Sequence, residues 1–316
     1  MRFKVIFTES YLTEEGRHYL ESNNCEVGVK SLRWEPEEEL IDALRDADAV
    51  IAGGEKYSER VLMAAKKLKV IARLGTGTDA IDLAAATLAG ITITNTPGAN
   101  SPAVAEMTLG LMLSLCRQIP QLDSSMKKGI WKQPVATELS SSTVGIVGMG
   151  CIGHEVIKRL KPFGSRIVVF DVVRDSDFAE KWGVEYVSLE HLMEISDIVS
   201  IHVPLRDDTR GLINADLLRR MKPTAYLVNT SRGPVVEREA LMHALEKKLI
   251  AGAALDVHWR EPCEPNDPLV IMENVIATPH VGYNTREAQA RMVKAAAEDV
   301  VAVLNGRPPR FPVNVK

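Results

Sequence analysis

A glycine-rich turn near the middle of the chain constrains the fold most strongly. An apolar, β-type run at 143–147 leads directly into Gly148-Met149-Gly150-Cys151-Ile152-Gly153, and a helix-like segment follows. Glycines at this spacing let the backbone approach a pyrophosphate, while the N–H groups and the positive end of the next helix face that anion. The pattern is specific only in this context of strand and helix. It predicts a dinucleotide site, with the cofactor contacted by Gly148, Gly150, Cys151, Ile152 and Gly153.

The residue after the next apolar run indicates which dinucleotide is bound. The run at 166–170 ends in Asp171, eighteen residues after Gly153. In this type of fold, an acid at that place holds the ribose 2′-hydroxyl of NAD, and its charge repels the 2′-phosphate of NADP. Arg174 is the nearby cation that would offset this repulsion. We therefore expect NAD as the cofactor.

Composition excludes several classes of partner. The chain has 316 residues, of which 46% are hydrophobic and 25% charged, as in soluble proteins of about two domains. A net charge of −4, with no basic block, argues against nucleic acid and anionic membranes as partners. The N-terminus reads as a strand and not as a signal peptide. We expect a cytoplasmic protein with reduced thiols and no metal site, because its four cysteines lie far apart at positions 25, 116, 151 and 263.

Strand-like and helix-like segments alternate on both sides of the glycine turn. Before it, strands are expected at 3–8, 25–30, 49–53, 70–74 and 91–95, with helices at 13–22, 37–46, 58–67 and 83–89. After it, strands are expected at 166–170, 198–202, 225–229, 251–256 and 275–277, with helices in the gaps. This alternation predicts an α/β fold with two doubly wound parallel sheets.

Two helical segments bear on domain organisation. The segment 286–305 reads as a long amphipathic helix that returns to the first sheet. We therefore expect a substrate-binding domain of residues 1–98 and 285–316, interrupted by an NAD-binding domain of residues 99–284. The apolar stretch 103–116 is too short to span a bilayer and predicts a buried helix, capped by Ser101 with Pro102 at its first position. Its uniform apolarity suggests packing between domains or against another subunit.

Three polar residues follow predicted strands of the second sheet, where open α/β sheets bind their ligands. They are Arg232, Glu261 and His280. A guanidinium holds a carboxylate through two hydrogen bonds, and a histidine exchanges a proton with a hydroxyl near neutral pH. Glu261 is an acid that would hydrogen-bond the imidazole. Taken singly, Arg232 and Glu261 also fit ordinary surface residues.

The remaining histidines lack such a setting, with two qualifications. His258 lies near Asp256 and Glu261 in sequence, and His202 precedes Val203-Pro204, where it would line the cofactor site. The others, at positions 18, 154, 191 and 243, read as surface or core residues. Cys151 and Cys263 read as small space-filling side chains.

The ensemble of motifs resembles the D-isomer-specific 2-hydroxyacid dehydrogenase family over nearly the whole chain, and most of all the catalytic part of its D-3-phosphoglycerate dehydrogenases. Arg232 and Glu261 are 29 residues apart, and Glu261 and His280 are 19 apart, as in that family. The matching stretches are 73–79, 94–98, 104–106, 148–153, 229–233, 256–262 and 278–282.

The resemblance implies roles for individual residues. Arg232 would bind the substrate, His280 would be the acid/base, and Glu261 would support His280. Backbone amides around Leu74, Gly75 and Thr76 would bind the substrate carboxylate. Further contacts to the cofactor would come from Pro204, Thr230, Asp256 and Gly282. The family also implies an NAD-binding Rossmann domain inserted into a flavodoxin-like substrate domain, and a homodimer.

Departures from the family pattern leave the substrate open. Phosphoglycerate dehydrogenases usually carry a basic residue in the loop after the third strand, where this chain has Gly53-Gly54-Glu55-Lys56, and position 80 is alanine where asparagine is common. We also expect no appended regulatory domain. Substrates to consider are 3-phosphoglycerate on one side, and glyoxylate, hydroxypyruvate or another sugar acid on the other. An NAD(H)-sensing, corepressor-like binding protein is the alternative from another class, although no long disordered tail is visible.

Overall fold

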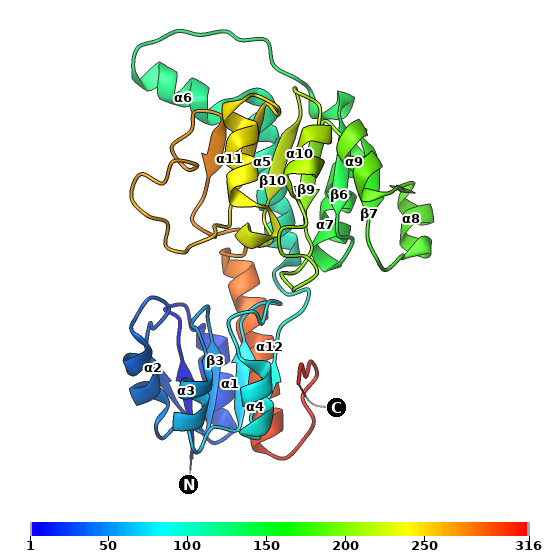
Figure 1. The fold of residues 1–316 in the computed structure, drawn as a ribbon. Coiled ribbons are helices and arrows are strands. Elements are labelled where there is room, and N and C mark those ends of the chain that lie inside the picture. Colours follow the sequence, from blue (N-terminus) through cyan, green and yellow to red (C-terminus); the bar gives the residue numbers. More distant parts are fainter. Residues whose placement is uncertain (1, 315–316) are drawn as a thin grey trace. The chain divides into compact units, whose positions relative to one another are not determined.

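The computed structural model describes residues 2–314, and the chain divides into two compact units (Figure 1). Unit 1 is Met1–Asn100 with Asn284–Lys316, and unit 2 is Ser101–Tyr283. These boundaries lie within two residues of those expected from the sequence. Each unit is a parallel sheet covered by helices, which confirms the predicted fold class of two parallel-sheet α/β domains.

Within the described part of unit 1, five parallel strands pair in the order β2-β1-β3-β4-β5. The strands are β1 (Phe3–Phe7), β2 (Cys25–Val29), β3 (Ala49–Ala52), β4 (Val70–Arg73) and β5 (Thr92–Thr94). The helices are α1 (Glu14–Ser22), α2 (Glu37–Leu44), α3 (Glu59–Ala64), α4 (Leu83–Leu88) and α12 (Arg286–Leu304). The strand order reverses direction between β1 and β3, which is the flavodoxin-like arrangement.

Burial on both faces explains the apolar runs of unit 1. All four residues of β3 are buried, as expected for a central parallel strand. One face is covered by α2, α3 and α4, and α12 lies against β3 and β4 on the sheet. A side chain at Gly16 of α1 would collide with Val293 of α12, so glycine permits this close helix contact.

Unit 2, which the structure describes completely, is a seven-stranded parallel sheet in the order β12-β11-β10-β9-β6-β7-β8. Its strands are β6 (Thr143–Val147), β7 (Arg166–Phe170), β8 (Glu185–Tyr186), β9 (Ile198–Ile201), β10 (Tyr226–Asn229), β11 (Gly252–Leu255) and β12 (Val275–Ala277). Its α-helices are α5 (Ser101–Arg117), α6 (Ile119–Lys127), α7 (Cys151–Leu160), α8 (Ser176–Trp182), α9 (Leu189–Ile195), α10 (Ala215–Arg220) and α11 (Arg238–Glu246).

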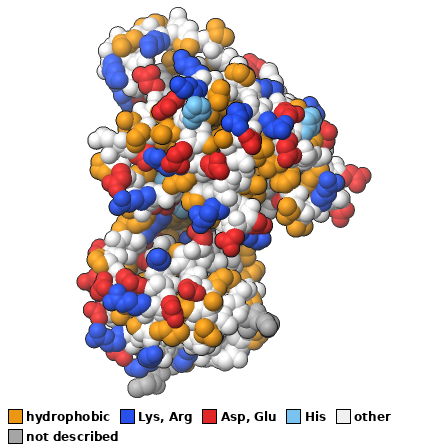
Figure 2. Space-filling view, viewed as in Figure 1, with side chains coloured by type: hydrophobic (Ala, Val, Ile, Leu, Met, Phe, Trp, Pro, Cys, Tyr) orange, Lys and Arg blue, Asp and Glu red, His pale blue; other side chains and the backbone are white. Residues whose placement is uncertain are grey.

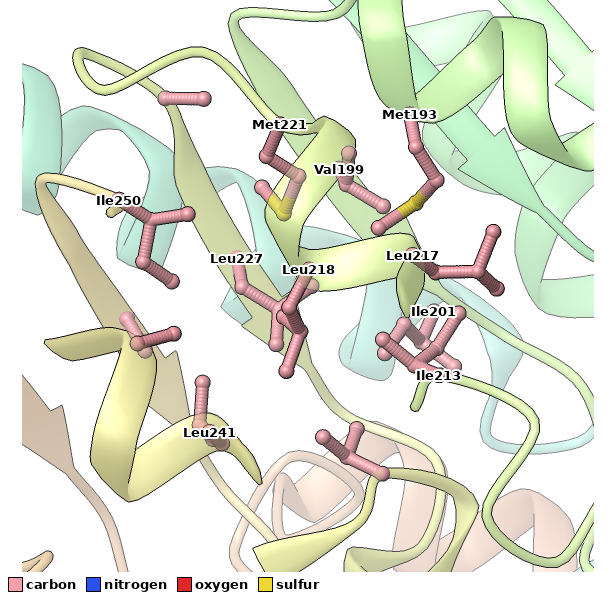
Figure 3. Packing of buried hydrophobic residues seen from close by; sticks show 14 of the residues in the cluster. Met193, Val199, Ile201, Ile213, Leu217, Leu218, Met221, Leu227, Leu241 and Ile250 are labelled. Carbon is pink, nitrogen blue, oxygen red and sulfur yellow. The ribbon is translucent and has the colours of Figure 1, made fainter. Parts of the chain in front are cut away.

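Two hydrophobic cores sandwich this sheet. Successive strand residues alternate between them: Val199 and Ile201 join the core under α9, α10 and α11, whereas Ile198 joins the core under α5 and α7. Figure 3 shows Leu218 of α10 beside Leu227 of β10 in the first core. The strand order reverses between β6 and β9, and ligands of open α/β sheets bind outside the carboxyl ends at such a point.

Three details differ from the sequence-based expectations. Helix α5 includes Ser101, and the Ser101 hydroxyl has no hydrogen-bond partner in the described residues, so the predicted N-cap is wrong. The turn at 97–100 leads straight into the helix and places Ser101 at its first position. The apolar helix α5, for which packing between domains or against another subunit was expected, packs against α7, β10 and β11 of its own unit. The short strand β8 and the helix α6 were not predicted.

The surface carries charges of both signs. On the face shown in Figure 2, acidic and basic side chains are interspersed over each unit, with hydrophobic side chains between them. No helix among residues 2–314 has the length and apolarity to cross a membrane.

Candidate active site

The glycine turn joins β6 to α7, and its glycines serve different purposes. Gly148 has a φ of 98°, and a Cβ there would lie 2.8 Å from the Val203 amide nitrogen. A Cβ at Gly153 would collide with the carbonyl oxygen of Gly148. By contrast, a Cβ at Gly150 would have no neighbouring atom within 4 Å, and the φ of Gly150 is negative, as it is for most residues. The chain itself therefore requires glycine at 148 and 153, while Gly150 leaves free the surface that a pyrophosphate would approach.

Helix α7 offers its N-terminus at the same place. Its N-cap is Gly150, and no side chain caps its first N–H groups. Uncapped N–H groups and the helix dipole together attract anions. Cys151, the first helical residue, is exposed. The turn thus has the shape and the polarity that a dinucleotide phosphate needs.

Asp171 follows β7 and lies directly against the glycine turn. Its Oδ2 accepts a hydrogen bond from the Met149 amide at 2.6 Å, and its Oδ1 accepts one from the Val173 amide at 2.9 Å. The Arg174 guanidinium lies over the Tyr186 ring, 5.2 Å from its centroid. The acid is therefore fixed beside the turn, and the cation that would offset it stacks on an aromatic ring.

His202 follows β9 and lies beside this turn, where the strand order reverses. A Cβ at Gly148 would lie 2.9 Å from the carbonyl carbon of His202, so the two backbones are in close contact. The His202 Nε2 lies 2.9 Å from the Ser200 hydroxyl, and its Nδ1 is buried without a partner in the described chain. Burial lowers the pKa of His202 to about 3, and the ring is neutral at physiological pH.

Arg232, Glu261 and His280 follow β10, β11 and β12, which are neighbours in the sheet. The structure brings two of them into direct contact: His280 Nδ1 lies 2.7 Å from Glu261 Oε2. The carboxylate of Glu261 is fixed in turn, because its Oε1 accepts a hydrogen bond from the His258 amide at 3.0 Å. Both side chains are largely shielded from solvent. This is the carboxylate–imidazole pair that the sequence predicted.

Arg232 belongs to a loop that packs against the segment containing His258 and Glu261. Its Nη1 donates to the Ser231 carbonyl at 2.8 Å, and the Asn229 side chain donates to the Arg232 carbonyl at 2.9 Å. A Cβ at Gly233 would collide with the backbone of His258, so the Arg232 loop packs directly on the residue whose amide holds Glu261. Thr230 lies 3.0 Å from the Thr108 hydroxyl of α5.

Asp256 fixes the loop that carries His280. The buried Asp256 carboxylate accepts hydrogen bonds from the Thr278 hydroxyl at 2.6 Å, the Val281 amide at 3.0 Å and the Gly282 amide at 2.8 Å. His280 itself has a φ of 55°, a left-handed conformation that is uncommon outside glycine. The loop is therefore held on both sides of a strained histidine.

His258 contributes more than the sequence indicated. Besides its amide bond to Glu261, its Nε2 lies 2.9 Å from the Thr278 carbonyl oxygen, to which it donates. The segment 256–261 thus holds the loop 278–282 through Asp256, His258 and Glu261. In the sequence, only the proximity of His258 to Asp256 and Glu261 indicated a role for it. Its contact with Thr278 joins residues that are 20 apart, and the sequence alone does not show such a contact.

In the loop after β4 of unit 1, two of the three backbone amides of residues 74–76 donate hydrogen bonds within that unit. The Leu74 amide donates to the Ala52 carbonyl at 2.9 Å, and the Gly75 amide donates to the Thr96 hydroxyl at 2.7 Å. Gly75 has a φ of 118°, which glycine adopts readily. Of the three amides expected to bind substrate, only that of Thr76 lacks a partner within residues 2–314.

Comparison with known proteins identifies the family of this chain. The family model of the D-isomer specific 2-hydroxyacid dehydrogenase, NAD binding domain, matches residues 109–282, which lie inside unit 2. The chain is 45% identical to a glyoxylate reductase of Thermofilum pendens, covering 92% of this chain and 88% of the relative. It is 39% identical to a D-3-phosphoglycerate dehydrogenase of Archaeoglobus fulgidus, covering 99% of this chain but only 59% of the relative.

Solved structures agree with the sequence relatives. The protein TT0316 of Thermus thermophilus superposes with a TM-score of 0.90 at 36% identity, covering 98% of this chain and 100% of that one. A D-lactate dehydrogenase of Aquifex aeolicus, complexed with NAD and lactic acid, has a TM-score of 0.86 at 27% identity and covers 99% of both chains. The match to this family model and the identity to these relatives show that the chain belongs to the D-isomer-specific 2-hydroxyacid dehydrogenase family of NAD-dependent oxidoreductases.

Proposed function

We propose that the protein catalyses reversible hydride transfer between NAD(H) and C2 of a small 2-hydroxy or 2-oxo acid, with His280 as the acid/base. The observation that carries this proposal is the 2.7 Å contact between His280 and Glu261, on loops that follow adjacent strands of the unit matching the NAD-binding domain. An imidazole oriented by a carboxylate is suited to moving one proton at a hydroxyl oxygen.

The chain's own residues supply the proton and hold the substrate. When held at the glycine turn 148–153, the reduced cofactor would supply the hydride that C2 accepts. His280 donates a proton to the C2 oxygen from Nε2, because its Nδ1 is engaged by Glu261. The products are a 2-hydroxy acid and a neutral imidazole, which takes a proton from solvent. Arg232 binds the substrate carboxylate and polarises the carbonyl, and the Thr76 amide of the loop Leu74–Thr76 adds a backbone contact to the carboxylate.

The remaining contacts to the cofactor follow from the shape of the turn. Gly148, Gly150, Cys151, Ile152 and Gly153 would hold the pyrophosphate, because the space at Gly150 is open and α7 begins uncapped there. Asp171 would bind the ribose and select NAD over NADP. Further contacts would come from Pro204, Thr230, Asp256 and Gly282. We propose that unit 2 is the NAD-binding domain and that unit 1 is the substrate-binding domain.

A substrate panel tests the proposal. Purified protein is assayed with NADH and NADPH against glyoxylate, hydroxypyruvate, pyruvate and phosphohydroxypyruvate, and with NAD against 3-phosphoglycerate. Turnover of one or more acids with NADH, and much less with NADPH, is the expected result. Tight NADH binding without turnover of any acid would instead favour an NAD(H)-sensing binding protein.

We also propose that the protein is a cytoplasmic homodimer. None of the nine residues of α6 is buried, and apolar side chains of α6 and the following segment are about half exposed or more: Ile119, Met126, Ile130, Trp131 and Val135. Exposed apolar groups at this density favour a protein contact. The four cysteines are unpaired, which suits a reducing compartment. Sedimentation equilibrium should give twice the mass of one chain, and a monomer would contradict the dimer.

A further inference from the structure

The loop after β5 holds the proposed substrate loop of residues 74–76 in unit 1. The Thr96 hydroxyl accepts a hydrogen bond from the Gly75 amide at 2.7 Å, and the Thr96 amide donates to the Gly75 carbonyl at 3.0 Å. The Asn95 side chain donates from Nδ2 to the Thr76 carbonyl at 2.9 Å. Two consecutive residues after β5 thus fix two consecutive residues of the substrate loop.

These contacts set the direction of the Thr76 amide. The Gly75 carbonyl and the Thr76 N–H belong to one trans peptide group, so they point in opposite directions. Thr96 holds that peptide group by its carbonyl, and Asn95 holds the next one by the Thr76 carbonyl. Thr76 is exposed, and its N–H has no partner within residues 2–314. The N–H that the proposed function assigns to the substrate carboxylate is therefore aimed by Asn95 and Thr96.

The C-terminal tail, residues 310–314, holds the loop after β5 in turn. Strand β5 lies at an edge of the described part of the unit 1 sheet, and the tail pairs with it through an antiparallel bridge between Thr94 and Pro312. One residue further on, the Asn95 amide donates to the Phe311 carbonyl at 3.3 Å. Asn95 therefore links the tail, which binds its backbone, to the substrate loop, which its side chain holds.

Two polar side chains attach the tail at its two ends. Asp299 of α12 is 1% exposed, and its Oδ1 accepts a hydrogen bond from the Arg310 amide at 2.7 Å. At the other end, Asn314 Oδ1 accepts a hydrogen bond from the Ile93 amide at 2.8 Å, and Asn314 Nδ2 donates to the Ile91 carbonyl at 2.9 Å. The Asn314 side chain thus gives this edge the acceptor and the donor that a neighbouring strand would give.

We propose that Asn95 is a positioning residue for substrate binding, and that the C-terminal tail 310–314 acts on the substrate carboxylate through it. Without the Asn95 contact, the Thr76 N–H no longer keeps the direction that a hydrogen bond to a carboxylate requires. The carboxylate is not the group that reacts, so this N–H binds it equally before and during hydride transfer. Loss of alignment therefore raises the KM for the acid and leaves kcat unchanged. The inference rests on the proposed function and adds two determinants of its substrate affinity.

Steady-state kinetics with NADH and the best 2-oxo acid of the substrate panel test the proposal. Asn95→Ala should raise the KM for the acid by roughly tenfold, the effect of weakening one hydrogen bond to a charged group, with kcat and the KM for NADH unchanged. Asn314→Ala, which leaves Asn95 intact, should raise the same KM by a smaller factor. Asn23→Ala is the matched control, because it also removes a side-chain hydrogen bond to a carbonyl of unit 1, that of Tyr19 at 2.8 Å. It should change none of the three constants.

Each outcome supports or overturns a stated part of the proposal. An unchanged KM for the acid in Asn95→Ala would overturn it, and so would a fall in kcat at unchanged KM. A raised KM in Asn95→Ala with a wild-type KM in Asn314→Ala would overturn the role of the tail. If Asn95→Ala does not fold, Asn314→Ala decides, because a wild-type KM in that protein would refute the link between tail and substrate loop. Equal rises in all three variants would show a general loss of stability and overturn the proposal. A wild-type protein that turns over no 2-oxo acid would overturn the proposed function itself.

Discussion

His202 should make the stability of unit 2 depend on pH. Its pKa is lowered from 6.5 to about 3 in the folded protein, because burial disfavours the charged ring. A depressed pKa means that the full stability is present above the unfolded value of 6.5 and is lost as pH falls from there toward 3. At pH 5 the unfolded chain binds the proton and the folded chain does not. The resulting loss between pH 7 and pH 5 is at most about 2 kcal/mol, since part of the residue is exposed.

Calorimetry on matched variants measures this loss. For a unit of this size, about 2 kcal/mol corresponds to a Tm decrease of roughly 4–8 °C. His202→Gln keeps a hydrogen-bonding group near Ser200 but has no proton to take up, so its Tm should fall less between pH 7 and pH 5. His191→Gln is the control, because His191 is exposed on α9 and should behave as the wild type. Parallel decreases in Tm for the wild-type and His202→Gln proteins would refute the argument.

The catalytic loop and the glycine turn give three further predictions. His280→Ala should keep NADH affinity, measured by fluorescence titration, but lower kcat by ~10²- to 10⁴-fold; near-normal kcat would remove His280 from the mechanism. Glu261→Gln should lower reductive kcat while keeping NADH affinity, because a neutral amide holds His280 Nδ1 less strongly than a carboxylate does, and an unchanged kcat would leave Glu261 a structural role. Gly150→Ala should keep the Tm yet weaken NADH binding, whereas Gly153→Ala should cost about 1–3 kcal/mol of stability because its Cβ meets the carbonyl oxygen of residue 148. Equal Tm values for the two alanine variants would contradict that distinction.

All strands except the two-residue β8, and their order along the chain, were predictable from local sequence. The runs at 143–147 and 166–170 match β6 and β7 residue for residue, because buried parallel strands read as continuous apolar segments bounded by turns. Several other strands end one residue earlier than expected, as β9 does before His202. Such ends depend on where neighbouring strands stop pairing, which a single sequence does not encode.

The break between α5 and α6 shows a different limit. Gln118 adopts a left-handed conformation with a φ of 51°, and Pro120 follows in the next helix. Glycine or asparagine usually marks such a position, so nothing in the local sequence identifies glutamine there. The fixed loop around His280 was also beyond prediction in detail. Its contacts with Asp256 join residues 22 to 26 apart in sequence, and only the folded sheet brings them together.

The place of α12 in unit 1 has a consequence for synthesis on the ribosome. Strands β3 and β4 emerge early, but the helix that lies against them occupies residues 286–304. A nascent chain that ends after β5 therefore lacks the helix that lies against β3 and β4 until almost the whole polypeptide has been made. Unit 2 is contiguous and is translated in the meantime. Although domains usually fold in the order of translation, here the inserted domain is able to fold before the one that started first.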